Sequence, residues 1–312
     1  MVQGKIVVLY GGPSTESAVS KMSADAVFEA IQSFHANVEK LEYSKNWVAN
    51  LQKINPAFVF NAMHGCPGED GRVQATLDEL GFPYQGSGFT ASVKAMDKNL
   101  SKKEFASVGL DVPKAVLFSA VELPASLPFY PVFIKPNHGG SSVNTFKVEN
   151  EAQWPEVKSK LQHANDGMPA DDVLVEEFVQ GREFTVAVMG GRTLGVMEMR
   201  PNEGRQFFDY AAKYTKGMTE YIYPAPIATE VYNKAESEAL KAHKALGCTG
   251  VSRVDFLYDE VKNRLVILEV NTLPGMTSTS LVPKMAKAHH MSYEEVLVWM
   301  IEDGLNTHKN NR

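Results

Sequence analysis

Two β-rich runs near the end of the chain, residues 251–258 and 265–271, constrain its fold most strongly. The segment between them is polar and contains an Asn, which is typical of a hairpin connection. The sequence therefore predicts two antiparallel strands here. Because the side chains of a strand alternate between its two faces, Arg253 and Asp255 are expected on one face of the first strand.

Glu269 and Asn271 are expected on one face of the second strand for the same reason. If the register brings the two faces together, two carboxylates and a carboxamide form an oxygen-only site of the kind that Mg²⁺ prefers, and Arg253 faces a substrate anion. The alternative is a cross-strand polar face on a solvated sheet. The strongly apolar flanking residues favour a cleft, and hence the metal site.

The composition, with 312 residues of which 44% are hydrophobic and 22% charged, is that of a globular protein of about two to three domains. A net charge of -6 without a basic run argues against general binding to nucleic acid or to an anionic membrane. Cys66 and Cys248 lack the spacing of a metal site, which indicates a reduced, cytoplasmic setting. No apolar run is long enough to span a membrane, and residues 5–10 are too short for a signal peptide.

The N-terminal region has the pattern of a parallel α/β unit. Residues 5–10 are expected to form a buried strand, followed by a Gly-rich turn and a helix, and residues 57–63 a second buried strand. Glu16 and His64 then follow the carboxyl ends of two strands, where open α/β sheets bind ligands. Each also has a purely structural interpretation, Glu16 as a complement to the helix end and His64 as a buried structural histidine. The turn lacks the P-loop and dinucleotide motifs.

The middle of the chain predicts a Lys-rich helical region over residues 92–108 and a series of short strands. Strands are expected at 114–118, 131–136, 145–148, 172–179, 183–189 and 193–200, and helices at 230–246 and within 283–304. The loop 137–144 contains Gly-Ser-Ser directly after Lys135, so it offers N–H groups and hydroxyls to a phosphate, although small polar loops are common. Residues 201–223 lack periodicity and are rich in charged and Tyr side chains, which is typical of a lid or binding loop.

Eight motifs, in order along nearly the whole chain, resemble one family. They are Gly11-Gly-Pro-Ser-Thr-Glu-Ser-Ala-Val-Ser20, His64-Gly-x-x-Gly-Glu-Asp-Gly71, Lys135-Pro, Gly140-Ser-Ser142, Glu183-Phe-Thr-Val, Asp209-Tyr-x-x-Lys-Tyr214, Arg253-x-Asp255 and Glu269-Val-Asn-Thr-Leu-Pro-Gly-Met-Thr-x-x-Ser-Leu281. Together they resemble the D-alanine:D-alanine ligases of the ATP-grasp superfamily.

The resemblance implies an α/β protein of three domains, with α+β character in the ATP-grasp part. A Rossmann-like parallel sheet over residues 1–96 would precede a two-domain ATP-grasp fold, with a central domain over 97–181 and a C-terminal domain over 182–312. The C-terminal domain would hold the metal hairpin and the lid loop 201–223, and ATP would lie between the last two domains. The implied activity is ATP-dependent joining of two D-alanines through an acylphosphate, for peptidoglycan precursors.

The family's site residues can be placed position by position on this sequence. The ATP-binding residues would be Lys98, Lys135, Ser142, Glu176, Glu177, Phe178, Val179, Glu183 and Lys213. The catalytic residues would be Glu16, Ser141, Tyr214, Arg253, Gly275 and Ser280, and the two D-alanines would contact Glu16, His64, Ser280 and Leu281. Asp255, Glu269 and Asn271 would bind two Mg²⁺ ions, for which Mn²⁺ is an alternative. The expected partners are D-alanine, ATP and a second copy of the chain, in the cytoplasm, without nucleic acid or membrane.

Two positions depart from the family pattern in the phosphate loop, Gly139 where Glu is frequent and Asn144 where Gly is usual. Asn tolerates a left-handed backbone, so the turn is expected to form. Three functions stay open. The first is ligation of D-alanine, favoured by Tyr214, which related ligases that make D-alanyl-D-lactate tend to lack. The others are an ATP-grasp ligase or kinase for other amino or hydroxy acids, and an inactive nucleotide-binding protein, which would have no need of Arg253.

Overall fold

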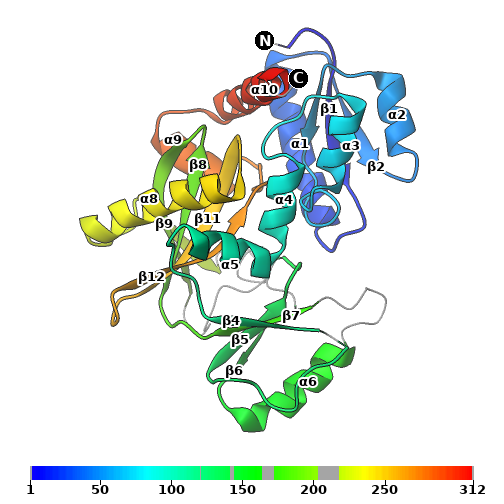
Figure 1. The fold of residues 1–312 in the computed structure, drawn as a ribbon. Helices are drawn as coiled ribbons and strands as arrows, with labels where there is room; N and C mark the ends of the chain where they lie inside the picture. Colours follow the sequence, from blue (N-terminus) through cyan, green and yellow to red (C-terminus); the bar gives the residue numbers. More distant parts are fainter. Residues whose placement is uncertain (1, 120, 141–143, 164–171, 203–217, 311–312) are drawn as a thin grey trace.

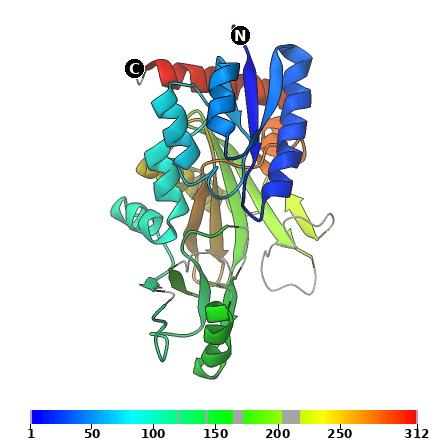
Figure 2. The same cartoon turned by 90° about the vertical axis from the view of Figure 1, so that its right-hand side faces the viewer.

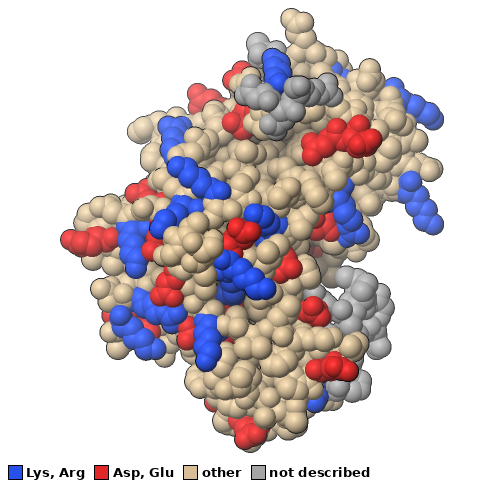
Figure 3. Space-filling view, viewed as in Figure 1, with Lys and Arg blue, Asp and Glu red and all other residues tan. Residues whose placement is uncertain are grey.

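The computed structural model describes residues 2–119, 121–140, 144–163, 172–202 and 218–310. Within these residues the chain forms three sheets with helices packed against them, placed one after another along an elongated molecule (Figure 1). In the described part of the chain, no helix combines the length and the apolar character needed to cross a membrane. On the face seen in Figure 3, Lys and Arg are interspersed with Asp and Glu.

The first sheet is parallel, with the strand order β2-β1-β3. Its strands are β1 (Ile6–Gly11), β2 (Val38–Tyr43) and β3 (Phe58–Asn61), and its helices are α1 (Ser17–Phe34), α2 (Trp47–Ile54) and α3 (Arg72–Leu80). Val7, Val8 and Leu9 are fully buried because helices cover both sides of the strands (Figure 2). The loops after β1 and β3, which carry Glu16 and His64, lie at the same edge of the sheet because the two strands are parallel.

The second sheet is antiparallel, with the strand order β4-β7-β5-β6. Its strands are β4 (Ala115–Phe118), β5 (Val132–Pro136), β6 (Phe146–Val148) and β7 (Val173–Glu177), and the helical segments η1 (Glu151–Gln153) and α6 (Trp154–His163) follow β6. The indole of Trp154 is 1% exposed and packs with Val132, Ile134 and Val175. This sheet and α6 form the lower part of the molecule in Figure 1.

The third sheet is also antiparallel, with the strand order β10-β9-β8-β11-β12. Its strands are β8 (Arg182–Met189), β9 (Arg192–Pro201), β10 (Thr219–Ile222), β11 (Val251–Asp259) and β12 (Arg264–Asn271). The tight turn between β8 and β9 consists of Gly190 and Gly191, both at positive φ. Two-residue turns with positive φ match the right-handed twist of the strands that they connect. The predicted hairpins are therefore confirmed.

Three helices cover one face of the third sheet: α4 (Phe89–Met96), α5 (Lys98–Ser107) and α8 (Thr229–Leu246). Phe105 of α5 is fully buried in one core with Phe184 and Phe256 of the sheet. α5 therefore packs against the third sheet. Its first turn, at Lys98, contacts the loop that follows β5 of the second sheet.

The last two helices, α9 (Leu281–Ala288) and α10 (Tyr293–Asn310), match the two expected near the end of the chain. α10 packs against α1, and Val296 and Ile301 share a core with Ile6 and Phe58 of the first sheet (Figures 1 and 2). The end of the chain thus fixes the first sheet to the third.

Candidate active site

The β11–β12 hairpin has the register that the sequence required. Arg253 pairs with Asn271 and Asp255 pairs with Glu269 across the two strands, so the predicted convergence of these four side chains is confirmed. The register shifts directly after Asp255, and such a bulge re-aims the neighbouring side chains. Asp255 is 3% exposed, and its carboxylate accepts hydrogen bonds from Arg253 Nε and Nη2 (2.9 and 2.7 Å) and from Thr185 Oγ1 (2.6 Å).

The donor set of the hairpin fits Mg²⁺. Asp255 and Glu269 supply carboxylate oxygens beside each other, and the amide oxygen of Asn271 keeps a lone pair although it accepts a hydrogen bond from the Leu273 N–H (2.9 Å). Among the described residues, no group of three or more His, Cys, Asp and Glu could hold a metal, so the carboxylates of the hairpin have no third such side chain beside them. A hard cation with few protein ligands and several substrate or water oxygens suits this set.

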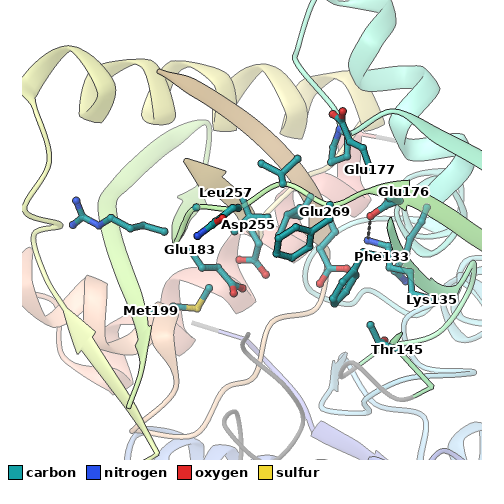
Figure 4. Close-up of a pocket in the computed structure, with 18 of the residues that line it drawn as sticks. Phe133, Lys135, Thr145, Glu176, Glu177, Glu183, Met199, Asp255, Leu257 and Glu269 are labelled. Carbon is teal, nitrogen blue, oxygen red and sulfur yellow. Dashed lines mark ion pairs between the residues drawn. The ribbon is translucent and has the colours of Figure 1, made fainter. Parts of the chain in front are cut away.

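A cavity of about 690 Å³ lies between the second and third sheets (Figure 4). This volume is in the range of small-molecule and cofactor sites. The predicted site residues among those that line it are Lys98, Lys135, Glu176, Glu177, Phe178, Val179, Glu183, Asp255 and Glu269. Phe133, Met199 and Leu257 add apolar wall, as expected of a pocket that receives a planar ring. The cavity therefore combines apolar lining residues, two lysines and the paired carboxylates.

Glu176 is the most deeply buried charge of this wall. Its side chain is 3% exposed, and its two oxygens form ion pairs with Lys102 Nζ (2.7 Å) and Lys135 Nζ (2.9 Å). Burial raises the pKa of the Glu176 carboxyl, but the ammonium groups of Lys102 and Lys135 outweigh it and the pKa ends below its ordinary value. Sequence reasoning missed Lys102. Its spacing of four residues from Lys98 on one helix was the only available signal.

Lys98 connects the first turn of α5 to the phosphate loop. Its Nζ donates a hydrogen bond to the carbonyl of Gly139, and its N–H donates to the carbonyl of Asn137 (3.2 Å). The amide of Asn137 in turn donates to the Asp97 carboxylate (2.9 Å), which caps α5 by accepting from the Leu100 N–H. The start of the loop is thus fixed to the helix that carries Lys98.

At the end of β7, the side chains of Glu177 and Phe178 contact other protein groups. Glu177 forms an ion pair with Arg264 at the end of the β11–β12 turn (2.6 Å), and the Phe178 ring lies 3.9 Å from Lys147 Nζ. Arg264 also pairs with Asp111 (2.8 Å), so this cluster joins the second sheet to the third next to the cavity. A ligand would meet mainly the backbone here.

Glu16 lies where three parts of the chain meet. A Cβ added to Gly65 would fall 3.2 Å from Glu16 Oε2, and one added to Gly140 would fall 3.5 Å from the same atom. The carboxylate therefore lies between the loop after β3 and the phosphate loop. Ser14 supports this arrangement, because its hydroxyl donates to the His64 carbonyl (2.7 Å) and accepts from the Glu16 N–H (3.2 Å).

His64 is buried, and both ring nitrogens contact protein groups. Nδ1 lies 3.2 Å from Glu69 Oε1 and Nε2 lies 2.9 Å from Ser23 Oγ. Its Cε1 would lie 4.0 Å from a Cβ added to Gly275, which places the ring edge against the loop after β12. The structural role and the site role of His64 are therefore compatible.

Ser280 and Leu281 form the start of α9 at the same place. A Cβ added to Gly275 would lie 3.2 Å from Ser280 Oγ, and this hydroxyl accepts a hydrogen bond from the Thr277 N–H (3.0 Å). Ser280 is the N-cap and Leu281 the first residue of the helix, so the N-terminus of α9 begins directly at the end of this loop. Such an end favours a carboxylate.

Four predicted residues, Ser141, Ser142, Lys213 and Tyr214, lie outside the described residues. The others form two neighbouring groups. One is the cavity with Lys98, Lys135 and the hairpin, and the other is the cluster of Glu16, His64, Gly275 and Ser280, which meets the first at Gly140.

A cavity held between two antiparallel sheets, with paired lysines on one wall and paired carboxylates on the other, is that of an ATP-grasp protein. Residues 117–302 match the family model described as the D-ala D-ala ligase C-terminus. The chain belongs to the D-alanine–D-alanine ligase family.

Curated relatives and a solved structure agree with this membership. The chain is 40% identical to the D-alanine–D-alanine ligase of Bartonella henselae over 300 residues, covering 96% of this chain and 97% of the relative. It is 42% identical to that of Paramagnetospirillum magneticum over 313 residues, with 96% and 98% covered. The fold superimposes with a TM-score of 0.82 on the D-alanine–D-alanine ligase of Bacillus anthracis complexed with ATP, at 28% identity, covering 99% of this chain and all of the other.

Proposed function

We propose that this protein joins two molecules of D-alanine to D-alanyl-D-alanine at the expense of ATP, for peptidoglycan precursors. The observation that carries the proposal is the meeting of two groups of side chains at Gly140: the cavity with its carboxylate hairpin, and the cluster of Glu16, His64 and Ser280. One group suits a nucleoside triphosphate, and the other suits a small zwitterion, whose ammonium and carboxylate need opposite partners.

ATP binding uses the cavity between the second and third sheets. Adenine contacts the segment from Glu176 to Val179, Glu183 binds the ribose, and Lys98, Lys135, Ser142 and Lys213 contact the phosphates. Two Mg²⁺ ions, or Mn²⁺ in their place, would be held by Asp255, Glu269 and Asn271 and would neutralise charge on the transferred phosphoryl group.

The first step activates a carboxylate. Glu16 holds the ammonium of the first D-alanine, with Ser141 and Tyr214 completing the network around it. A carboxylate oxygen of this D-alanine attacks the γ-phosphorus of ATP, the bond to the β-phosphate breaks, and ADP and an acylphosphate result. Lys98 and Lys135 stabilise the phosphoryl charge and fix the geometry, which is most of what such a transfer requires of a protein.

The second step forms the peptide bond. Ser280 and Leu281 hold the carboxylate of the second D-alanine at the start of α9. Its amine, after losing a proton, attacks the acyl carbon, and the C–O bond to phosphate then breaks. Arg253 and the Gly275 N–H stabilise the oxygen that becomes negative. His64 would help to remove that proton, and the oxygens that contact its two ring nitrogens, Ser23 Oγ and Glu69 Oε1, can both accept a hydrogen bond from the protonated ring.

Water must be kept from the acylphosphate, and the part of the expected lid 201–223 that lies between the end of β9 and the start of β10 is proposed to exclude it. The protein is further proposed to act in the cytoplasm as a homodimer. The rival function is an ATP-grasp ligase or kinase for other amino or hydroxy acids, since the ATP and metal residues would be the same.

A screen of D-amino acids, L-amino acids and D-hydroxy acids with ATP and Mg²⁺, read by product mass, tests the proposal. The expected main product is D-alanyl-D-alanine, with L-alanine far less productive because Glu16 and the carboxylate site fix one enantiomer. A mixed ester or a phosphorylated hydroxy acid as the main product would support the rival function instead.

A further inference from the structure

Glu176 is contacted by two lysines that come from different elements. Lys102 lies on α5 and Lys135 on β5, and their side chains are 6% and 13% exposed. Lys135 and Glu176 line the nucleotide cavity, where Figure 4 shows their ion pair, whereas Lys102 is not part of the lining. Lys102 therefore contacts the carboxylate from behind the cavity wall.

We propose that Lys102 is a positioning residue that makes the charge of Lys135 available to the triphosphate of ATP. The inference rests on the proposed function of this cavity. Burial lowers the pKa of the Lys102 ammonium, and the neighbouring Glu176 carboxylate raises it. With Lys102 and Lys135 both protonated against the Glu176 carboxylate, the three groups together carry one positive charge. Without Lys102, Glu176 and Lys135 would form a neutral pair, and the ammonium of Lys135 would be drawn to the carboxylate instead of to a phosphate.

The energetics of burial favour a role in binding over a role in packing. Desolvating an ionic group is costly, and an apolar side chain of similar volume in place of Lys102 would fill the same space without that cost. An excess positive charge at the wall of a cavity is instead compensated when an anion enters it. The other carboxylate that attracts Lys102, Glu269, belongs to the proposed metal site at the phosphate end of the cavity.

Lys102→Met in the full-length protein tests the inference, with ATP, ADP and adenosine as ligands. Their affinities are measured by calorimetry, or for adenosine by competition. We expect the affinity for ATP and ADP to fall about tenfold or more and the affinity for adenosine to change less than about threefold, because only phosphates sense Lys135. Lys102→Arg should restore most of the loss. Equal weakening of all three ligands would mean a merely structural role and would overturn the inference.

Two further variants separate the possible failures. Lys103→Met alters the next residue of α5, which is exposed, and should leave all three affinities unchanged. Lys135→Met should weaken ATP; if it does not, the phosphate assignment in the proposed function is wrong. A loss with Lys135→Met but none with Lys102→Met would refute the role of Lys102 alone. Should Lys102→Met fail to fold, Lys102→Gln retains an N–H donor to Glu176 without the charge and must show the same split between ATP and adenosine.

Discussion

At the scale of single residues, Glu269 carries the sharpest prediction. It pairs directly with Asp255 on the hairpin and lines the cavity. Glu269→Gln keeps the size of the side chain and removes its charge, so kcat should fall at least about 100-fold, or about 2.7 kcal/mol in the barrier, while the thermal midpoint stays near that of the unchanged protein. Glu294→Gln, an exposed change on α10, is the control. Normal turnover with Glu269→Gln would refute the metal site.

The same scale shows how far sequence reasoning could reach. Alternation along a strand places Arg253 with Asp255 without knowledge of the fold, and the backbone tolerance of Asn correctly anticipated Asn144, which has a φ of 53°. Lys102 and Glu176 are 74 residues apart in the sequence. Lys102 lies on a helix that packs against the third sheet, and Glu176 lies on a strand of the second sheet. No local pattern encodes such a contact, because it depends on how the sheets pack.

At the scale of elements, α8 is joined to β11 by a buried histidine. His243 Nδ1 lies 2.7 Å from Ser252 Oγ, and burial, helped by the nearby Lys244, lowers the pKa of the imidazole from 6.5 to about 4. The unfolded chain therefore binds a proton that the folded protein does not between these two values, so stability falls as pH falls through this window.

The measurement is urea unfolding at pH 7.5 and pH 5. The buried imidazole should account for about 2 kcal/mol of the stability lost between these pH values. The His243→Gln variant has no group at this position that titrates between pH 7.5 and pH 5. The stability that it loses over this interval should therefore be smaller than that of the unchanged protein by about 2 kcal/mol. Identical pH dependence of the two proteins would show that His243 is not held neutral.

Elements also differ in how clearly the sequence encodes them. β1 is an unbroken apolar run and was predicted, whereas β2 has one buried residue, Leu41, and was not. β10 lies within the segment that the sequence predicted to be irregular. Its own residues show no strand pattern, and it is a strand because it pairs with the end of β9. The single helical region expected over residues 92–108 is two helices, because Asp97 is extended and begins the second by capping it.

At the scale of the whole molecule, the site draws on all three sheets. The loops after β1 and β3 supply Glu16 and His64, β5 and β7 supply Lys135 and Glu176, and the β11–β12 hairpin supplies the carboxylates. Periodicity alone could not predict that these three sheets contribute to one site. The order of the motifs along the chain did predict it, because that order resembles a family of known fold. The return of α10 to the first sheet had no sequence signal beyond an amphipathic tail.

The most direct test of the account is phosphate release from ATP, followed with and without D-alanine, L-alanine and Mg²⁺. Phosphate leaves only when the second D-alanine attacks the acylphosphate, so release should require D-alanine and Mg²⁺ together and be far slower with L-alanine. Release at the same rate with no amino acid present would contradict the ligase assignment.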